Sequence, residues 1–475
     1  MPLGDTGRAR LSGLSRHPLI LALPSVMLLW ATTWRGLFDP GFWYDEAFGV
    51  DYANLPLGEL WRRMTETDPQ MAGYYLLLKV WLPVNDSDAW ARLPSLIATS
   101  VTLLLIVLIT RRITAGRAAP MMAALAVSAF PDVRWHAVDA RGYAIATSLV
   151  MLTVFLSTTP ELGSTRLRVR VLSIGIPMGV AATFNIFVLF AFVPFALAIM
   201  TTSGRVRNLG RLVLAGIITL AFLIPFVPPY LKIQGGDFWI QPIPFEDWLQ
   251  SVSNQPGWLD RSLTALAVLL VITGILGAFR GDWIGRGPNA PSGNIVVLFG
   301  LMGFLPLLLL AVFAELRQPA IVPRYVGYSL PFLVAGVVLL AHPWWSRATH
   351  WAVLRVGVVG LALIAVSWSL WAPFIQRPLQ DEYRAASAYV ISNAGPDDVI
   401  IATSVPSVLE RYGVELERRA SGQTRRLWTI GYGGASLEYL TQRAEELGLV
   451  VTGATPAEER FGSAAVVSIE VTPEP

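Results

Sequence analysis

The chain has 475 residues, of which 54% are hydrophobic and 15% charged, and its formal net charge is +3. Soluble domains usually carry about 25% charged residues, and apolar runs of roughly 18 residues are typical of transmembrane helices. Such runs recur along this sequence, which excludes an ordinary soluble protein and predicts a polytopic membrane protein with no nucleic-acid partner. Cysteine is absent, which excludes disulfides and thiol chemistry. The four histidines are too scattered to predict a histidine-based metal site, although oxygen ligands could still hold a divalent cation.

The first external segment is predicted by counting basic loops. Residues 1–16 carry three arginines and are expected to be cytoplasmic, so the apolar run 18–37 crosses outward. A cleaved signal peptide is the alternative, but no Ala-x-Ala-like site follows the run. Gly73–Val84 is too short to span and predicts an interfacial helix. The next span, 91–110, ends at cytoplasmic arginines. Residues 38–90 are therefore expected to form one external loop.

The same procedure predicts about 11 spans, with the N-terminus cytoplasmic and the C-terminus extracytoplasmic. A second external loop is expected at 230–260, and a transmembrane domain at 1–375. The later spans are predicted near 118–131, 139–158, 212–229, 262–279, 295–313, 326–341 and 351–372, with two short helices in 171–200 that break near Thr183–Asn185.

From about residue 376 the long apolar runs give way to hydrophobic alternation, turns and charges. This pattern predicts an extracytoplasmic α/β domain over 376–475. Its expected helices are Asp381–Ala394 and 436–447, and its expected strands are Asp398–Thr403, Leu427–Ile430 and Ala464–Val471.

The first candidate for chemistry is the pair Asp45 and Glu46, which lies among aromatic residues just beyond the first span. Acids held at a membrane surface under aromatic cover can have the perturbed pKa values that catalytic bases require. Asp68 lies in the same external loop. The alternative is a solvated pair of carboxylates with no chemical role.

Three further groups of ionisable residues lie at outer helix ends. Asp139, Arg141 and Tyr143 stand at the start of one span, and they either serve function or form a local ion pair at the interface. Arg324 and Tyr325 precede a helix that contains Pro331, and a guanidinium there suits a phosphate group. Arg317 has weaker support for the same role. Lys232 heads the second external loop, which either lines a substrate cleft or supplies interfacial anchors.

Several short motifs in order resemble the GT-C fold glycosyltransferases. They are Asp45-Glu46, Asp68 with Tyr74-Tyr75, Arg92-Leu93-Pro94-Ser95, Asp139-Ala140-Arg141-Gly142-Tyr143-Ala144 and Arg324-Tyr325. The group they resemble most is family 39, the polyprenyl-phosphate mannosyltransferases and lipid A aminoarabinose transferases. The resemblance covers about 40–160 and 320–335. Gln70-Met71-Ala72-Gly73, Asp139 and Thr183-Phe184-Asn185 depart from the family's pattern, which puts the acceptor and any histidine-dependent step or metal in doubt.

The resemblance implies an inverting transfer of a sugar, mannose-like or another hexose or pentose, from a polyprenyl-phosphate donor at the outer face of the plasma membrane. The acceptor hydroxyl would belong to a lipid, glycan or protein. Asp45 would be the general base, and Glu46 would orient the acceptor or place Asp45. Arg324 and Arg141, with Tyr325, would bind the donor phosphate. The expected cleft residues are Asp68, Tyr74, Tyr75, Asp139, Tyr143, Lys232 and Arg317.

Two other functions fit the same architecture. A transporter or flippase of lipid-linked sugars would also need many spans, but the charges gather at outer helix ends and no inverted repeat is visible. A scaffold whose outer domain recruits wall polymers would need far fewer spans.

Overall fold

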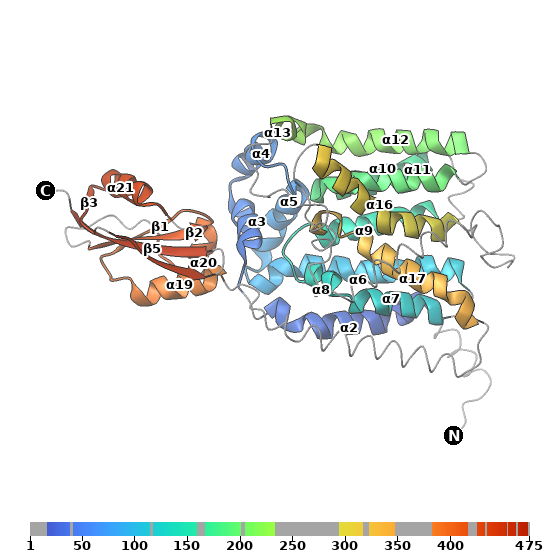
Figure 1. The fold of residues 1–475 in the computed structure, drawn as a ribbon, viewed down its shortest axis with the longest axis horizontal. Coiled ribbons are helices and arrows are strands. Elements are labelled where there is room, and N and C mark those ends of the chain that lie inside the picture. The colour runs from blue at the N-terminus through green and yellow to red at the C-terminus, as the bar shows by residue number, and fades with distance from the viewer. Residues whose placement is uncertain are drawn as a thin grey trace, which may run out of the picture.

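The computed structural model describes residues 17–38, 41–114, 117–158, 167–200, 205–232, 294–316, 323–346, 382–416, 425–432, 435–453, 455–461 and 464–473. A helical unit holds the described residues up to 346, and an α/β unit holds those from 382 onward. The two units lie end to end, with the α/β unit beside the short helices α3 and α4 (Figure 1). The largely helical architecture predicted from the sequence is confirmed.

Long helices run roughly parallel and antiparallel through the helical unit (Figure 1). In the described ranges, four segments are long and apolar enough to cross a membrane. They are Pro18–Phe38, Asp88–Ile113, Val206–Pro229 and Val297–Ala314. The helices that run through the helical unit are α2 (Pro18–Phe38), α6 (Asp88–Ile113), α7 (Ala118–Ala129), α9 (Tyr143–Ser157), α10 (Leu167–Phe184), α11 (Phe192–Met200), α12 (Arg205–Leu223), α16 (Asn294–Leu316) and α17 (Ser329–Ser346).

Two of the predicted spans are shorter than expected. Helix α7 has 12 residues and α9 has 15, so their lengths are about 18 and 22 Å. A bilayer's hydrocarbon core is about 30 Å thick. Pro131 opens a separate helix, α8 (Pro131–Ala137), and a turn at 138–142 precedes α9. The predicted spans 262–279 and 351–372, and most of the predicted loop 230–260, lie outside the described residues, so the count of 11 stays a prediction.

The predicted break in 171–200 is confirmed. Helix α10 ends at Phe184, and Asn185 is extended, with φ −161°. The Asn185 side chain accepts a hydrogen bond from the Phe187 amide and caps the short helix η3 (Ile186–Ala191). This side-chain cap competes with continued α-helix formation. The break therefore has a local cause in the sequence.

Residues 41–84 form three short helices at the end of the bundle nearest the α/β unit (Figure 1). They are α3 (Tyr44–Asn54), α4 (Leu57–Glu66) and α5 (Ala72–Trp81), and the turn η1 (Leu82–Val84) follows. The close approach of α5 to the break in α10 requires Gly73. A Cβ there would lie 2.3 Å from Thr183 Oγ1 and 3.0 Å from the Phe184 ring.

The α/β unit is built on a five-stranded sheet in which β5 is central. Strands β1 (Val399–Ala402) and β2 (Arg426–Tyr432) are parallel, with Val399 opposite Leu427. Strand β5 (Ala464–Pro473) is antiparallel to β2, β3 (Leu449–Val451) and β4 (Ala457–Phe461). Its helices are α19 (Glu382–Asn393), α20 (Pro406–Arg411) and α21 (Leu437–Glu446). The two helices and three strands expected here are present, with bounds shifted by at most two residues.

The α/β unit is fixed to the helical unit by polar contacts. Asp88, the first residue of α6, lies 2.5 Å from Arg384 Nη2 and 3.6 Å from Arg411 Nη2. The Tyr412 hydroxyl donates to Asp88 Oδ2 at 2.9 Å and accepts from the Phe42 amide at 2.9 Å. The segment just before α3 is therefore bonded directly to the α/β unit.

Candidate functional site

Asp45 lies in the first turn of α3, where three distant parts of the chain meet. Its Oδ2 atom is 3.0 Å from Arg324 Nη2 and 3.8 Å from Arg141 Nη2. Arg141 Nη1 also donates to the Asp45 carbonyl at 3.1 Å. The side chain of Asp45 is 17% exposed, so solvent or a ligand can reach it. The arrangement places one accessible carboxylate against two guanidinium groups.

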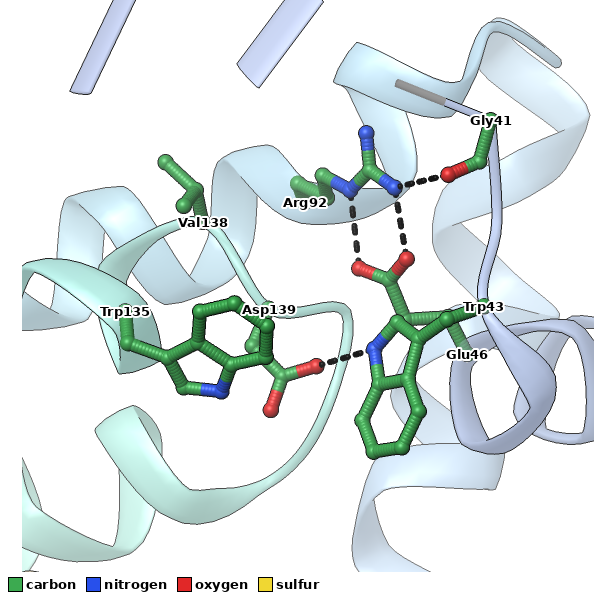
Figure 2. Close-up of a pocket in the computed structure, with 7 residues that line it drawn as sticks. All are labelled: Gly41, Trp43, Glu46, Arg92, Trp135, Val138 and Asp139. Atoms are coloured by element: carbon green, nitrogen blue, oxygen red, sulfur yellow. Dashed lines mark hydrogen bonds and ion pairs between the residues drawn. The ribbon is translucent and has the colours of Figure 1, made fainter. Parts of the chain in front are cut away.

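Glu46, the next residue, is fully enclosed. Its two oxygens accept from Arg92 Nε at 2.8 Å and Arg92 Nη2 at 2.5 Å, and Oε1 also accepts from the Ala140 amide at 2.7 Å. Arg92 Nη2 donates further to the Gly41 carbonyl at 2.8 Å (Figure 2). Glu46 is 1% exposed and Arg92 2%. Glu46 thus joins α3, α6 and the turn before α9, and it does not face the accessible side of Asp45.

Trp43 and Asp139 close the inner side of this arrangement. Trp43 Nε1 donates to Asp139 Oδ1 at 3.2 Å, and the Trp43 ring lies 6.4 Å from that of Trp135. The turn that carries Asp139 lies before α9, and burial raises the pKa of this carboxyl, with a further contribution from Glu46. A small pocket here is lined by Gly41, Trp43, Glu46, Arg92, Trp135, Val138 and Asp139 (Figure 2).

Arg324 is carried by the short helix η5 (Pro323–Val326), which is held by the break in α10. Asn185 Nδ2 donates to the Tyr325 carbonyl at 2.7 Å, and the Tyr325 ring stacks on Phe187 with centroids 4.7 Å apart. The Arg324 guanidinium lies over the Trp43 ring at 5.5 Å. Tyr325 is 9% exposed, and these contacts hold the backbone that presents Arg324.

Asp68 and Tyr75 form a second polar pair near Arg141. The Tyr75 hydroxyl donates to Asp68 Oδ2 at 3.2 Å, and the Gln70 amide donates to Oδ1 at 3.1 Å. Burial raises the pKa of Asp68, while the charge of Arg141 and these two hydrogen bonds oppose the rise.

Tyr74 differs from the expectation that it lines the cleft. It is fully buried, and its hydroxyl donates to the Ala91 carbonyl at 3.1 Å. Successive helical residues are about 100° apart. Tyr74 and Tyr75 therefore point in different directions, and Tyr74 packs α5 against α6.

Unpaired polar atoms gather around Asp45. Tyr143 is 3% exposed, and its ring lies 5.3 Å from that of His136. Buried polar atoms without a hydrogen-bond partner mark strain or a ligand position. Within the described ranges these atoms include Asp45 Oδ2 (ion-paired, but outside hydrogen-bond geometry), His136 Nδ1, Asp139 Oδ2, Arg141 Nε, Tyr143 Oη and Arg324 Nε. The concentration of such atoms makes this the candidate active site.

Two predicted residues cannot be compared with this cluster, because they are not described in full. Lys232 ends the helix α13 (Val227–Lys232), but its side chain is outside the described residues, as is all of Arg317. No group of three or more acidic or histidine side chains in the described ranges could hold a metal ion. The divalent cation left open by the sequence thus has no such group in that part of the chain.

Sequence reasoning gave no role to Arg92, Trp43 or Asn185. A signal existed for Arg92, because an arginine in the first turn of a long apolar helix requires a partner. Asn185 stood out as part of the predicted helix break and as a departure from a family pattern, but not as a residue of the site. No feature of the sequence indicated that Trp43 contacts Asp139.

Neither known protein families nor curated proteins gave a match to this chain. Two solved structures of ArnT from Cupriavidus metallidurans are similar in overall arrangement. The one bound to undecaprenyl phosphate is 14% identical, with a TM-score of 0.49, and the match covers 95% of this chain and 97% of that chain. The apo structure is 11% identical over the same shares, with a TM-score of 0.44. Neither likeness identifies what this chain binds or catalyses.

Proposed function

We propose that this chain is a membrane glycosyltransferase that moves a sugar from a polyprenyl-phosphate donor to an acceptor hydroxyl at the outer face of the membrane. The observation that carries the proposal is the accessible Asp45 carboxylate held between Arg324 and Arg141. A base and a cationic phosphate site at one point are what such a transfer requires. The short, ordered motifs described above support the same class of enzyme.

In the proposed reaction, Asp45 takes the proton of the acceptor hydroxyl. The acceptor oxygen attacks the anomeric carbon, and the bond between that carbon and the phosphate oxygen breaks. The polyprenyl phosphate leaves with the electron pair, and the anomeric configuration inverts. Arg324 and Arg141 offset the charge on the departing phosphate, and bidentate guanidinium contacts suit that group.

The free structure pairs these arginines with the base itself. A donor phosphate would compete with Asp45 for both guanidinium groups, because each of them lies within 4 Å of Asp45 Oδ2. Donor binding would then release the carboxylate toward the acceptor. Glu46 supports this step indirectly, because its bonds to Arg92 and Ala140 fix the first turn of α3, which carries Asp45.

The test uses the purified chain in detergent with polyprenyl-phosphomannose and related lipid-linked sugars. Asp45→Asn is expected to lower donor cleavage or transfer by roughly 10²–10⁴-fold, the usual contribution of a general base. Asp86→Asn, at an exposed carboxylate, is the matched control and is expected to retain activity. Full activity of Asp45→Asn would show that the base assignment is wrong. Movement of lipid-linked sugar across vesicles with no turnover would support the transporter instead.

A further inference from the structure

An accessible pair of aromatic rings lies directly beside the proposed base. Tyr44 opens α3 and precedes Asp45, and its ring lies 4.3 Å from the ring of Tyr432, at an angle of 36°. Tyr432 is the last residue of β2 in the α/β unit and is 52% exposed. Both units therefore contribute to this pair.

The pair begins a row of aromatic side chains along α3. Tyr44, Phe48 and Tyr52 are four residues apart and share one helix face. Their successive centroid distances are 6.0 and 4.3 Å, and Tyr75 follows 5.1 Å from Tyr52. Tyr432 is exposed, Tyr44 and Phe48 are half-buried, and Tyr52 and Tyr75 are buried. The row thus leads from solvent toward Asp68, the hydrogen-bond partner of Tyr75.

Polar groups border the accessible end of this row. Burial raises the pKa of Tyr44, and the charges of Asp45 and Asp68 raise it further. The Tyr44 ring stands against the ring of Tyr432, and Asp45 is the next residue of α3. An exposed aromatic ring, that of Tyr432, thus lies beside the residue that precedes the Asp45 carboxylate.

A sugar ring is the ligand that such a surface recognises. Aromatic faces carry partial negative charge and attract the C–H groups on the apolar face of a pyranose. The equatorial hydroxyls at the rim of that ring need acceptors, which carboxylates provide. The guanidinium groups that suit a lipid phosphate belong to Arg141 and Arg324, which lie on the connection before α9 and on η5 and not on this aromatic row.

On the premise of the proposed transferase, we propose that Tyr44 and Tyr432 form the acceptor subsite and that the acceptor is a glycan. One sugar ring packs on the two tyrosines, and its hydroxyl reaches Asp45. The α/β unit is then part of the substrate site, because it supplies the exposed ring.

The test measures binding by the purified full chain in detergent to an array of neutral oligosaccharides of hexoses and pentoses. Peptides and phospholipids are spotted beside them. The wild type is expected to retain a subset of the oligosaccharides. Tyr432→Ala is expected to weaken this binding at least tenfold, while Tyr432→Phe, which keeps the ring, retains it. Tyr439→Ala, a matched change in α21 of the same unit, is expected to bind as the wild type does.

Three outcomes would overturn the subsite. They are retention of no oligosaccharide, retention of peptides in place of glycans, and undiminished glycan binding by a folded Tyr432→Ala. The Asp45→Asn variant separates this inference from the proposed function. It is expected to bind the glycan and to lack turnover. If it cleaves the donor normally, the assignment of Asp45 as base fails, and if the wild type cleaves no donor, the transferase assignment fails. In both cases the array still reports on the subsite.

Discussion

The buried pair of Arg92 and Glu46 offers the sharpest test of how the site is held together. Arg92→Met removes the cation but leaves Glu46, which is 1% exposed, inside the protein. Three hydrogen bonds of 2.5–2.8 Å are lost with the guanidinium. Breaking one side of a buried ion pair costs about 3–5 kcal/mol, a large share of the roughly 5–15 kcal/mol that stabilises a typical domain. We therefore expect a large loss of stability.

The assay is denaturant unfolding in detergent, followed by tryptophan fluorescence. Arg62→Met is the matched control, because Arg62 forms exposed ion pairs with Glu59 and Glu66, and such pairs contribute little. The double variant Arg92→Met with Glu46→Leu is expected to regain much of the stability, since no charge is then left buried. The activity of the double variant is expected to stay low, because the Gly41 carbonyl loses its bond from Arg92 and the Ala140 amide loses its bond to Glu46. If Arg92→Met is no less stable than Arg62→Met, the positioning role of the pair is refuted.

Two further predictions concern the neighbouring carboxylates. Because burial raises the pKa of Asp68, its contribution to stability is greatest below the unfolded value of about 3.9 and is lost as pH rises through the higher folded value. Asp68→Asn should remove this loss and stabilise the protein at neutral pH, as thermal unfolding at several pH values would reveal; an unchanged pH profile would contradict it. Asp88→Asn should weaken the bonds to Arg384 and Tyr412. It should lower kcat and change the KM for the donor less than it changes kcat. Equal rates for the variant and the wild type would show that the contact between the units does not position Asp45.

Local patterns predicted the parts of the site but not how they meet. Asp45, Arg141 and Arg324 were each singled out by charge at an outer helix end. Their convergence depends on tertiary contacts such as the bond from Asn185 to the Tyr325 carbonyl. No periodicity in one segment encodes such a contact, which joins residues 140 positions apart.

Neighbouring residues in one motif also received roles that only the structure separates. Asp45 and Glu46 are adjacent, yet one side chain is accessible and the other is enclosed by Arg92. Tyr74 and Tyr75 are both buried, but Tyr74 bonds to the Ala91 carbonyl and Tyr75 to Asp68. The cause is the helical rotation of about 100° per residue, and the sequence cannot show which side faces the cleft until the neighbouring elements are in place.

The bond between Phe42 and Tyr412 has a consequence for the order in which the protein is made. The two residues are 370 positions apart, and ribosomes add about 5–20 residues per second. Roughly 20–70 s therefore pass between the synthesis of the two partners. During that time the nascent segment that carries Asp45 lacks its support from Tyr412. Completion of the α/β unit would thus be a late step in maturation, and chains arrested before it would hold the proposed phosphate-binding arginines while the segment before α3 lacks its bond to Tyr412.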